Sequence, residues 1–380
     1  MTVDVRVSAA TARLLWAAAR PDPDAAAIET ELESGADIDL AATAALANRV
    51  GPLYWRALRM AGVDDRLGAA AGPLKEEAKL RRAVADVLLP VALARIVHPL
   101  QGAGLDPLIF KGPSVAMRYP EPGLRSMDDI DVVLPARQHR AAIEALKGGG
   151  WEETYPPRAA VPRRSDVYDR AFVHRDVPQL PMELHWDVAA WHERATSVRA
   201  ADLWRARRPV PLFGVNASCL PPEEDLVALA NHAGKPFHHF GRLMWSVDLA
   251  VVIGATANDL DWERVAWLAQ RWRCCTVLAV ALRQARRLGA EVPETLVALP
   301  SARRRRDAIE PVLDERWPFV VPTEAVIYHL RYALADSRVR QAELLLGEVV
   351  FDAPTREIPG RAVKLAARIA RGSRRARNNL

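Results

Sequence analysis

Apolar residues recur at helical spacing through the first hundred positions of the chain. One clear example is the set Leu80, Val84, Val87, Leu88 and Ala92. Positions three and four residues apart lie on the same side of an α-helix, so such a set forms one apolar face. We therefore expect residues 1–100 to form a helical amino-terminal region.

The pattern changes after residue 101. Residues 107–110, "PLIF", form a short apolar run that leads into Lys111 and Gly112, as a buried strand leads into a turn. Pro113 follows, and proline suits the first position of a helix because the amide it lacks would have no partner there. The sequence predicts a strand, a turn and a short helix in this order.

Acidic residues interrupt two further apolar stretches. Residues 129–134 alternate, so that Asp129 and Asp131 share one side of a predicted strand and apolar residues share the other. Residues 171–188 are typical of two strands around a turn that contains proline, and Glu183 lies on the polar side of the second strand. Ionised carboxylates are costly to bury alone, so three of them on strands indicate a cation site.

Helical spacing returns after about residue 200 and continues to a basic amphipathic end, residues 360–380. The predicted fold is therefore α/β (α+β), with a small mixed-sheet core over residues 101–200. Helical regions over residues 1–100 and 201–380 flank it, and the second carries the basic tail.

Composition narrows the class of protein. The 380 residues are 50% hydrophobic and 26% charged, which is typical of a globular protein, and the net charge of +5 does not by itself argue for nucleic-acid binding. The three cysteines, Cys219, Cys274 and Cys275, form no CxxC pair, so neither a disulfide framework nor a cysteine zinc site is expected. Apolar stretches shorter than roughly 20 residues predict no membrane span, and the amino terminus lacks a secretory pattern. We expect a cytoplasmic protein.

The segment 108–135, with Glu183 downstream, resembles the nucleotidyltransferases of the DNA polymerase beta superfamily. The closer match is to a bacterial family of largely uncharacterised members, on the motifs "FKG", "RYP", "GLRSMDDID" and "MELHW". The resemblance covers about residues 105–190, is weaker over 231–250, and extends little into 1–80 or 300–380. The usual Gly-Gly or Gly-Ser turn is here Gly112-Pro113-Ser114, in which proline removes one backbone donor.

The resemblance implies transfer of a nucleoside monophosphate from an NTP, with release of pyrophosphate. Two Mg²⁺ or Mn²⁺ ions, about 3.5 to 4 Å apart, serve this chemistry because hard divalent cations bind carboxylate oxygens. Asp129, Asp131 and Glu183 are the predicted metal ligands and catalytic residues. Asp128 is expected to be a turn residue instead.

The predicted nucleotide-binding residues surround these acids in the sequence. They are Lys111, Gly112, Ser114, Arg125 and, from the helical carboxy-terminal region, Lys235. Each has an alternative role: Lys111 as an exposed lysine at a strand end, Arg125 as an ion-pair partner of the acids, and Lys235 in helix packing. His185 could orient a carboxylate, and Asp248 could be structural.

Three functions stay open at this point. The first is an Mg²⁺-dependent nucleotidyltransferase whose acceptor is a hydroxyl or phosphate of a small molecule, peptide or protein. The second is an RNA- or tRNA-directed transferase, which the basic tail and the "RRRR" run at 303–306 favour. The third is a catalytically silent nucleotide-binding module, which Pro113 favours.

Overall fold

The computed structural model describes residues 7–154, 168–188, 196–235, 238–320, 322, 324–339, 341, 342 and 344. Every structural statement below concerns these residues. The basic amphipathic helix and tail predicted for residues 360–380 lie outside the described residues.

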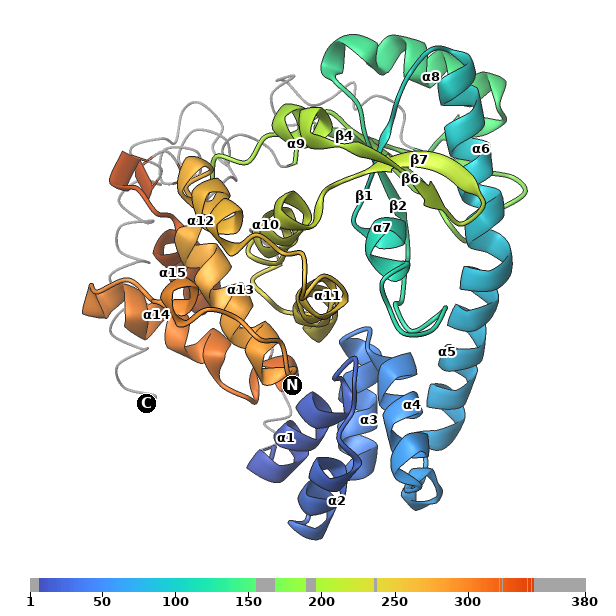
Figure 1. The fold of residues 1–380 in the computed structure, drawn as a ribbon. Helices are drawn as coiled ribbons and strands as arrows, with labels where there is room; N and C mark the ends of the chain where they lie inside the picture. The colour runs from blue at the N-terminus through green and yellow to red at the C-terminus, as the bar shows by residue number, and fades with distance from the viewer. Residues whose placement is uncertain are drawn as a thin grey trace, which may run out of the picture.

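Four helices form the amino-terminal bundle: α1 (Ala9–Ala18), α2 (Ala25–Glu33), α3 (Ile38–Ala47) and α4 (Gly51–Ala61) (Figure 1). The first three begin at Ser8, Asp24 and Asp37, whose side chains accept hydrogen bonds from amides of the first turn. These caps satisfy donors that have no partner within the helix. Gly62, in the left-handed region at φ 68°, ends α4.

A continuous helix joins this bundle to the sheet. It consists of α5 (Ala71–Ala83), a π-helical turn (Val84–Leu88) and α6 (Leu89–Gly102). Among the described residues, it is the one helix that length and composition alone would allow to cross a membrane. Within the fold, α6 packs against α8 (His139–Gly148) and the sheet, as core helices do.

The sheet is mixed and has seven strands. They are β1 (Leu108–Phe110), β2 (Ile130–Val133), β3 (Trp151–Glu153), β4 (Asp169–His174), β5 (Met182–His185), β6 (Arg208–Leu212) and β7 (Val215–Cys219). Their order is β3-β4-β5-β2-β1-β7-β6. The β2–β5 and β1–β7 pairs are parallel and the other pairs antiparallel. This arrangement confirms the predicted α/β class with helical regions on both sides.

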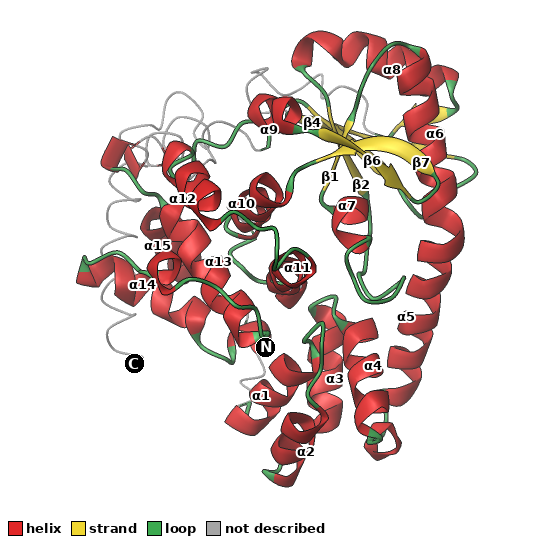
Figure 2. Ribbon diagram, viewed as in Figure 1, coloured by secondary structure: helices red, strands yellow, loops and turns green. Residues whose placement is uncertain are grey.

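The two sides of the sheet have different neighbours (Figure 2). Ile130, Val132, Met182 and Leu184 point to the side that α6 and α8 cover, and they belong to the core cluster of those helices. Side chains alternate along a strand, so the residues between them face the opposite side. That opposite side is where α7 (Gly112–Ala116) and the carboxy-terminal helices lie.

In the described part of the chain, seven α-helices follow β5 between residues 200 and 334. They are α9 (Ala200–Ala206), α10 (Pro222–Ala233), α11 (Leu243–Ala255), α12 (Trp262–Arg271), α13 (Cys275–Arg287), α14 (Arg303–Leu313) and α15 (Glu324–Leu334). Helix α11 is apolar on nearly all sides, and every residue from Leu243 to Ile253 is buried. It is therefore the central helix of this region, with α10 and α13 against it.

The sequence prediction of helices alone after residue 200 was wrong for residues 208–219, which form the β6–β7 hairpin. Two prolines, Pro209 and Pro211, make strand β6 unusual, because proline cannot donate to a sheet ladder. They are tolerated because β6 is the edge strand. Phe213 and Gly214, both at positive φ (45° and 86°), make the tight turn between the two strands.

The amino-terminal bundle also contacts the far end of the chain. The side chain of Asn48 donates to the carbonyl of Pro318 at 2.8 Å and accepts from the amide of Leu243 at 3.0 Å. The indole of Trp16 donates to the carbonyl of Glu315 at 2.7 Å. These contacts bring α1 and α3 against the carboxy-terminal helices, so the chain closes on itself (Figure 1).

Candidate active site

Two acids face each other across neighbouring parallel strands. Asp131 on β2 is directly opposite Glu183 on β5, and both point to the side of the sheet away from α6 and α8. Asp131 is only 3% exposed, whereas Glu183 is half-buried. The predicted approach of these two carboxylates is therefore what the strand register produces.

His185 lies between the two carboxylates. Its Nε2 is 2.9 Å from Asp131 Oδ1 and 3.2 Å from Glu183 Oε2. Burial of the ring would lower its pKa, but the hydrogen bonds to both carboxylates outweigh burial and raise the pKa of His185 to about 9. The imidazolium thus partly neutralises the two acids, and the suggestion that His185 orients a carboxylate agrees with this geometry.

Lys111 is the second cation at Asp131. Its Nζ lies 2.9 Å from Asp131 Oδ1, and the side chain is mostly buried, so the alternative of a simple exposed lysine does not describe it. Its backbone has φ 54° and ψ −123°, a conformation that residues with a Cβ seldom adopt. The strained position of this turn is therefore Lys111, the residue before Gly112.

The surroundings shift the pKa values of Asp129 and Asp131 in opposite directions. Burial raises the pKa of Asp129 to about 6, and the negative charge of Asp131 adds to this. Burial would also raise the pKa of Asp131, but Lys111 and the hydrogen bond from His185 outweigh it and hold that pKa well below its ordinary value. Asp131 is therefore the permanently charged member of the pair, and Asp129 is the more easily protonated one.

A further acid, Asp169, escaped the sequence reasoning. It begins β4, directly opposite His185 on β5, and its Oδ2 is 3.9 Å from His185 Nδ1. Burial raises its pKa. No local pattern marks Asp169, because only the antiparallel pairing of β4 with β5 brings it to the same side of the sheet.

Arg125 is fixed by an acid from the helical region. Its Nε and Nη2 donate to the two oxygens of Asp248 on α11, at 2.9 and 2.8 Å, and Tyr119 donates to the same carboxylate at 2.7 Å. The predicted alternative, an ion pair with the nearby acids, is replaced by this distant partner. The remaining nitrogen, Nη1, lies next to Gly112, only 3.9 Å from where a Cβ on that glycine would be.

The turn at Gly112 is closed by internal bonds. Pro113 occupies the first turn of α7, as predicted, and Ser114 is buried with its hydroxyl donating to the carbonyl of Lys111 at 2.7 Å. This hydroxyl stabilises the strained residue. Any role of Ser114 toward a ligand therefore falls to its backbone.

The carboxy-terminal helices reach the same place. Lys235, just after α10, has its Nζ 5.6 Å from the ring centre of Tyr168, and that ring stacks on His185. His232 Nδ1 lies 3.4 Å from Lys111 Nζ. Residues predicted from the sheet and from the helical region thus lie around one cluster.

Asp128 is outside this cluster. Its carboxylate lies 2.7 Å from Arg49 Nη2 and 3.5 Å from Arg81 Nη2. The Arg81 side chain also donates to the carbonyl of Met127 at 2.7 Å. Asp128 therefore fastens the segment before β2 to the amino-terminal helices through ion pairs, whereas the sequence suggested a turn residue.

The residues present fit a divalent cation. Oxygen or nitrogen atoms of Asp131, Glu183 and His185 all lie within 4.8 Å of one another, and carboxylates suit Mg²⁺ or Mn²⁺. Asp129 comes just before β2 and is not part of this group, although its pKa responds to the charges of both Asp131 and Glu183. Among the described residues, Asp131, Glu183 and His185 are thus the closest group of possible ligands, and Asp129 lies near Asp131 in the sequence, just before the same strand.

Comparisons with known proteins place the chain in a family. A family described as uncharacterised nucleotidyltransferases matches residues 34–290, a range that contains the whole sheet and every site residue above. No curated protein and no solved structure matches the chain. Because the matched range is well over half of the sequence, the chain belongs to this family of uncharacterised nucleotidyltransferases.

Proposed function

We propose that the protein is a cytoplasmic, metal-dependent nucleotidyltransferase of the DNA polymerase beta type. It transfers a nucleoside monophosphate from an NTP to a hydroxyl or phosphate of a small molecule, peptide or protein, and pyrophosphate leaves. The observation that carries the proposal is the pairing of Asp131 with Glu183 on adjacent parallel strands, beside the Lys111-Gly112 turn. Carboxylates and a cationic turn on one side of a sheet are what this reaction requires.

Asp129, Asp131 and Glu183 would hold the metal, and we propose two Mg²⁺ or Mn²⁺ ions. Bound there, the ions would neutralise the charge that develops on the phosphoryl oxygens and on the leaving pyrophosphate. His185 and Lys111 meanwhile compensate Asp131 from the protein side, through the contacts at 2.9 Å. The affinity of the site for a metal ion should therefore depend on how easily His185 and Lys111 release Asp131 Oδ1.

Three basic side chains would bind the triphosphate. Lys111 and Lys235 approach the cluster from the sheet and from the helical region, and Arg125 presents Nη1 beside Gly112 while Asp248 holds its other nitrogens. Charge-assisted hydrogen bonds to phosphate are the strong class of protein hydrogen bonds. The triphosphate would thus have basic side chains on two sides, from the sheet and from the helical region.

Glu183 is the acid with most access to solvent among the paired carboxylates, and we assign it to the acceptor. Its pKa is held below the ordinary value, first by the hydrogen bond from His185. It is therefore ionised at neutral pH and can take up the acceptor proton. His185 keeps its oxygen in place through the 3.2 Å contact.

The test is to incubate the protein with each α-labelled NTP, Mg²⁺ and a cell extract, and to ask which species acquires label. Asp131→Asn is the matched inactive control, because it keeps the size of the side chain and removes its charge. Label transfer by wild type and not by Asp131→Asn supports the proposal. Equal labelling with both proteins would contradict it.

A second candidate is a nucleotide-binding module without turnover. It is favoured by the Lys111–Asp131 ion pair, which occupies a metal-ligand oxygen, and by the amide that Pro113 lacks. Such a module would bind NTP yet release no pyrophosphate with any acceptor. An enzyme-coupled colorimetric assay of pyrophosphate release distinguishes the two candidates.

A further inference from the structure

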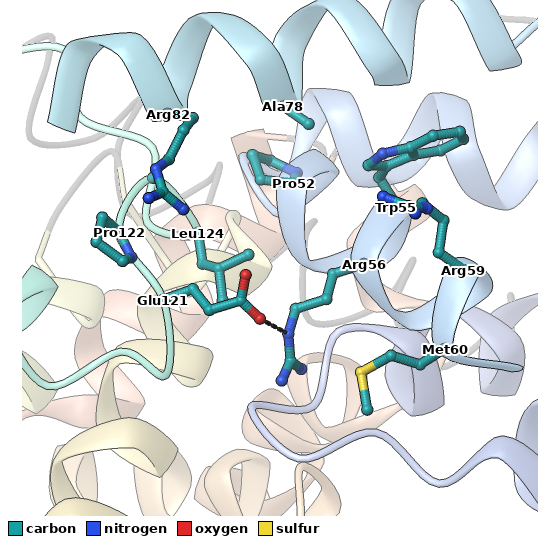
Figure 3. A pocket seen from close by; sticks show the side chains of 11 residues that line it. Pro52, Trp55, Arg56, Arg59, Met60, Ala78, Arg82, Glu121, Pro122 and Leu124 are labelled. Carbon is teal, nitrogen blue, oxygen red and sulfur yellow. Dashed lines mark hydrogen bonds and ion pairs between the residues drawn. The ribbon is translucent and has the colours of Figure 1, made fainter. Parts of the chain in front are cut away.

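A cavity of about 400 Å³ lies on the amino-terminal helices (Figure 3). Helix α4 contributes Trp55, Arg56 and Arg59, α5 contributes Arg82, and the segment after α7 contributes Glu121 and Leu124. None of these residues belongs to the acidic cluster on the sheet. The cavity combines an aromatic ring, aliphatic groups and three guanidinium groups.

Two of the three arginines already bind carboxylates. Arg56 Nε lies 2.6 Å from Glu121 Oε1, across the cavity in Figure 3, and Arg82 binds Asp86. In both pairs at least one partner is exposed, and such pairs contribute little to stability, about 0–1 kcal/mol. An incoming anion could therefore replace Glu121 at Arg56 without a large loss of protein stability.

Arg59 differs from them. Within the described part of the chain it makes no ion pair or side-chain hydrogen bond, and it is exposed. It lies one helical turn from Trp55 on α4, and both side chains line the same cavity (Figure 3). A guanidinium group beside an indole is a pair that binds a flat ring and a phosphate together.

Charge along the chain concentrates here as well. Residues 49–82 hold eight Lys and Arg against four Asp and Glu, a net charge of +4, although residues 1–48 hold three against eight. The whole protein carries only +5. The helices that form the cavity are thus the basic part of an otherwise acidic amino-terminal region, which favours an anionic ligand.

The cavity is attached to the catalytic segment. The backbone of Gly123, at φ 85°, packs so closely on α5 that a Cβ there would lie 2.6 Å from the Cα of Arg82. From Gly123 the chain runs on to Arg125 and Asp129. Arg81, the neighbour of Arg82, holds Asp128 and the carbonyl of Met127. An occupant of the cavity would therefore contact the segment that leads into β2.

We propose that this cavity is a second nucleotide site, which binds one nucleotide unit of the acceptor. Its phosphate would bind Arg59 and Arg56, displacing Glu121, and its base would lie against Trp55. The volume suits a single nucleotide, since ligand cavities in proteins are roughly 300–1,000 Å³. The acceptor role rests on the proposed function, whereas the binding itself does not. The nucleotide unit can be a free nucleotide, which is a small-molecule acceptor as in the proposed function, or the end of a single strand of RNA, which would change the acceptor class to RNA.

Equilibrium dialysis of the full-length protein with labelled AMP, in EDTA, tests the site without transfer chemistry. Arg59→Glu should weaken AMP binding at least tenfold, because a repelling charge replaces the unpaired cation. Glu121→Gln should tighten it severalfold, because Arg56 loses its competing carboxylate. Arg137→Glu, an equal charge reversal at an exposed arginine before α8, should leave it unchanged.

The proposal is overturned if Arg59→Glu affects AMP no more than Arg137→Glu does. It is also overturned if Lys235→Ala abolishes AMP binding and Arg59→Glu does not, since AMP would then lie at the acidic cluster. A 5′-phosphorylated oligoadenylate distinguishes the two sources: tighter binding than AMP by tenfold or more, still dependent on Arg59, assigns the site to an RNA end. Equal affinity assigns it to a free nucleotide. Absence of label transfer from NTP would remove the proposed function but not an Arg59-dependent AMP site.

Discussion

Replacing Asp248 with Asn would leave the guanidinium group of Arg125 buried without its counter-charge. Three donors converge on this carboxylate, from Arg125 Nε, Arg125 Nη2 and Tyr119 Oη, at 2.9, 2.8 and 2.7 Å. Asp248 is 1% exposed and Arg125 8%. Removing one partner of a buried ion pair costs about 3–5 kcal/mol, since the other charge stays in a low-dielectric site.

We expect Asp248→Asn to lower the free energy of unfolding by about that amount, measured by urea titration with far-ultraviolet circular dichroism. The matched control is the double variant Asp248→Leu with Arg125→Met, which removes both charges and keeps apolar volume. It should be less destabilised than the single variant, because no unpaired charge remains. A single variant within about 1 kcal/mol of wild type, or a double variant less stable than the single one, would refute the reasoning, given that surface changes usually stay within about 0.5 kcal/mol.

The remaining predictions concern the site and its acid sensitivity. Glu183→Gln should keep NTP affinity and abolish label transfer, whereas Asp131→Asn should reduce both. Calorimetry with Mg²⁺ and NTP measures the affinity, and the transfer assay measures the activity. Parallel losses in the two variants would contradict the assigned roles. Lys235→Ala should weaken NTP binding by about 1.5–3 kcal/mol, the usual contribution of a charge-assisted hydrogen bond, and leave the melting temperature unchanged. A loss of folding would instead indicate a packing role. Burial lowers the pKa of His239 from 6.5 to about 4, so the folded state binds fewer protons than the unfolded state between these values. The contribution of His239 to stability should be constant above pH 6.5 and fall by up to about 1.4 kcal/mol per pH unit below it. His239→Gln should reduce the slope of stability against pH below 6.5, and an equal slope in the variant would exclude a contribution from this histidine.

The strand, turn and helix around Lys111, and the strands that carry Asp131 and Glu183, could be predicted because their signals are local. An apolar run, a Gly-Pro step and period-two alternation each span only a few residues. Strand alternation also put His185 on the same polar side as Glu183 before any pairing was known. This much of the site follows from neighbours in the sequence.

The other parts of the site depend on pairings across long distances. Arg125 and Asp248 are 123 residues apart, and no spacing rule links a strand-side arginine to an acid within an apolar helix. Asp169 reaches His185 only through the register of β4 against β5. The cavity between α4, α5 and the segment after α7 likewise requires the tertiary fold, since each arginine in it would otherwise be an ordinary solvated side chain.

The hydrogen bonds of Asn48 have a consequence for how the protein is made. Asn48 and Pro318 are 270 residues apart, and at the usual synthesis rate of roughly 5–20 residues per second about 15 to 50 seconds separate their appearance. During that interval the amino-terminal helices can fold, but the surface that later receives α11 and the Pro318 segment stays open to other chains and to chaperones. Ribosome-bound nascent chains truncated before residue 318 should therefore aggregate or bind chaperones more than chains that extend well past it, because the contacts that close the fold can form only after Pro318 has emerged.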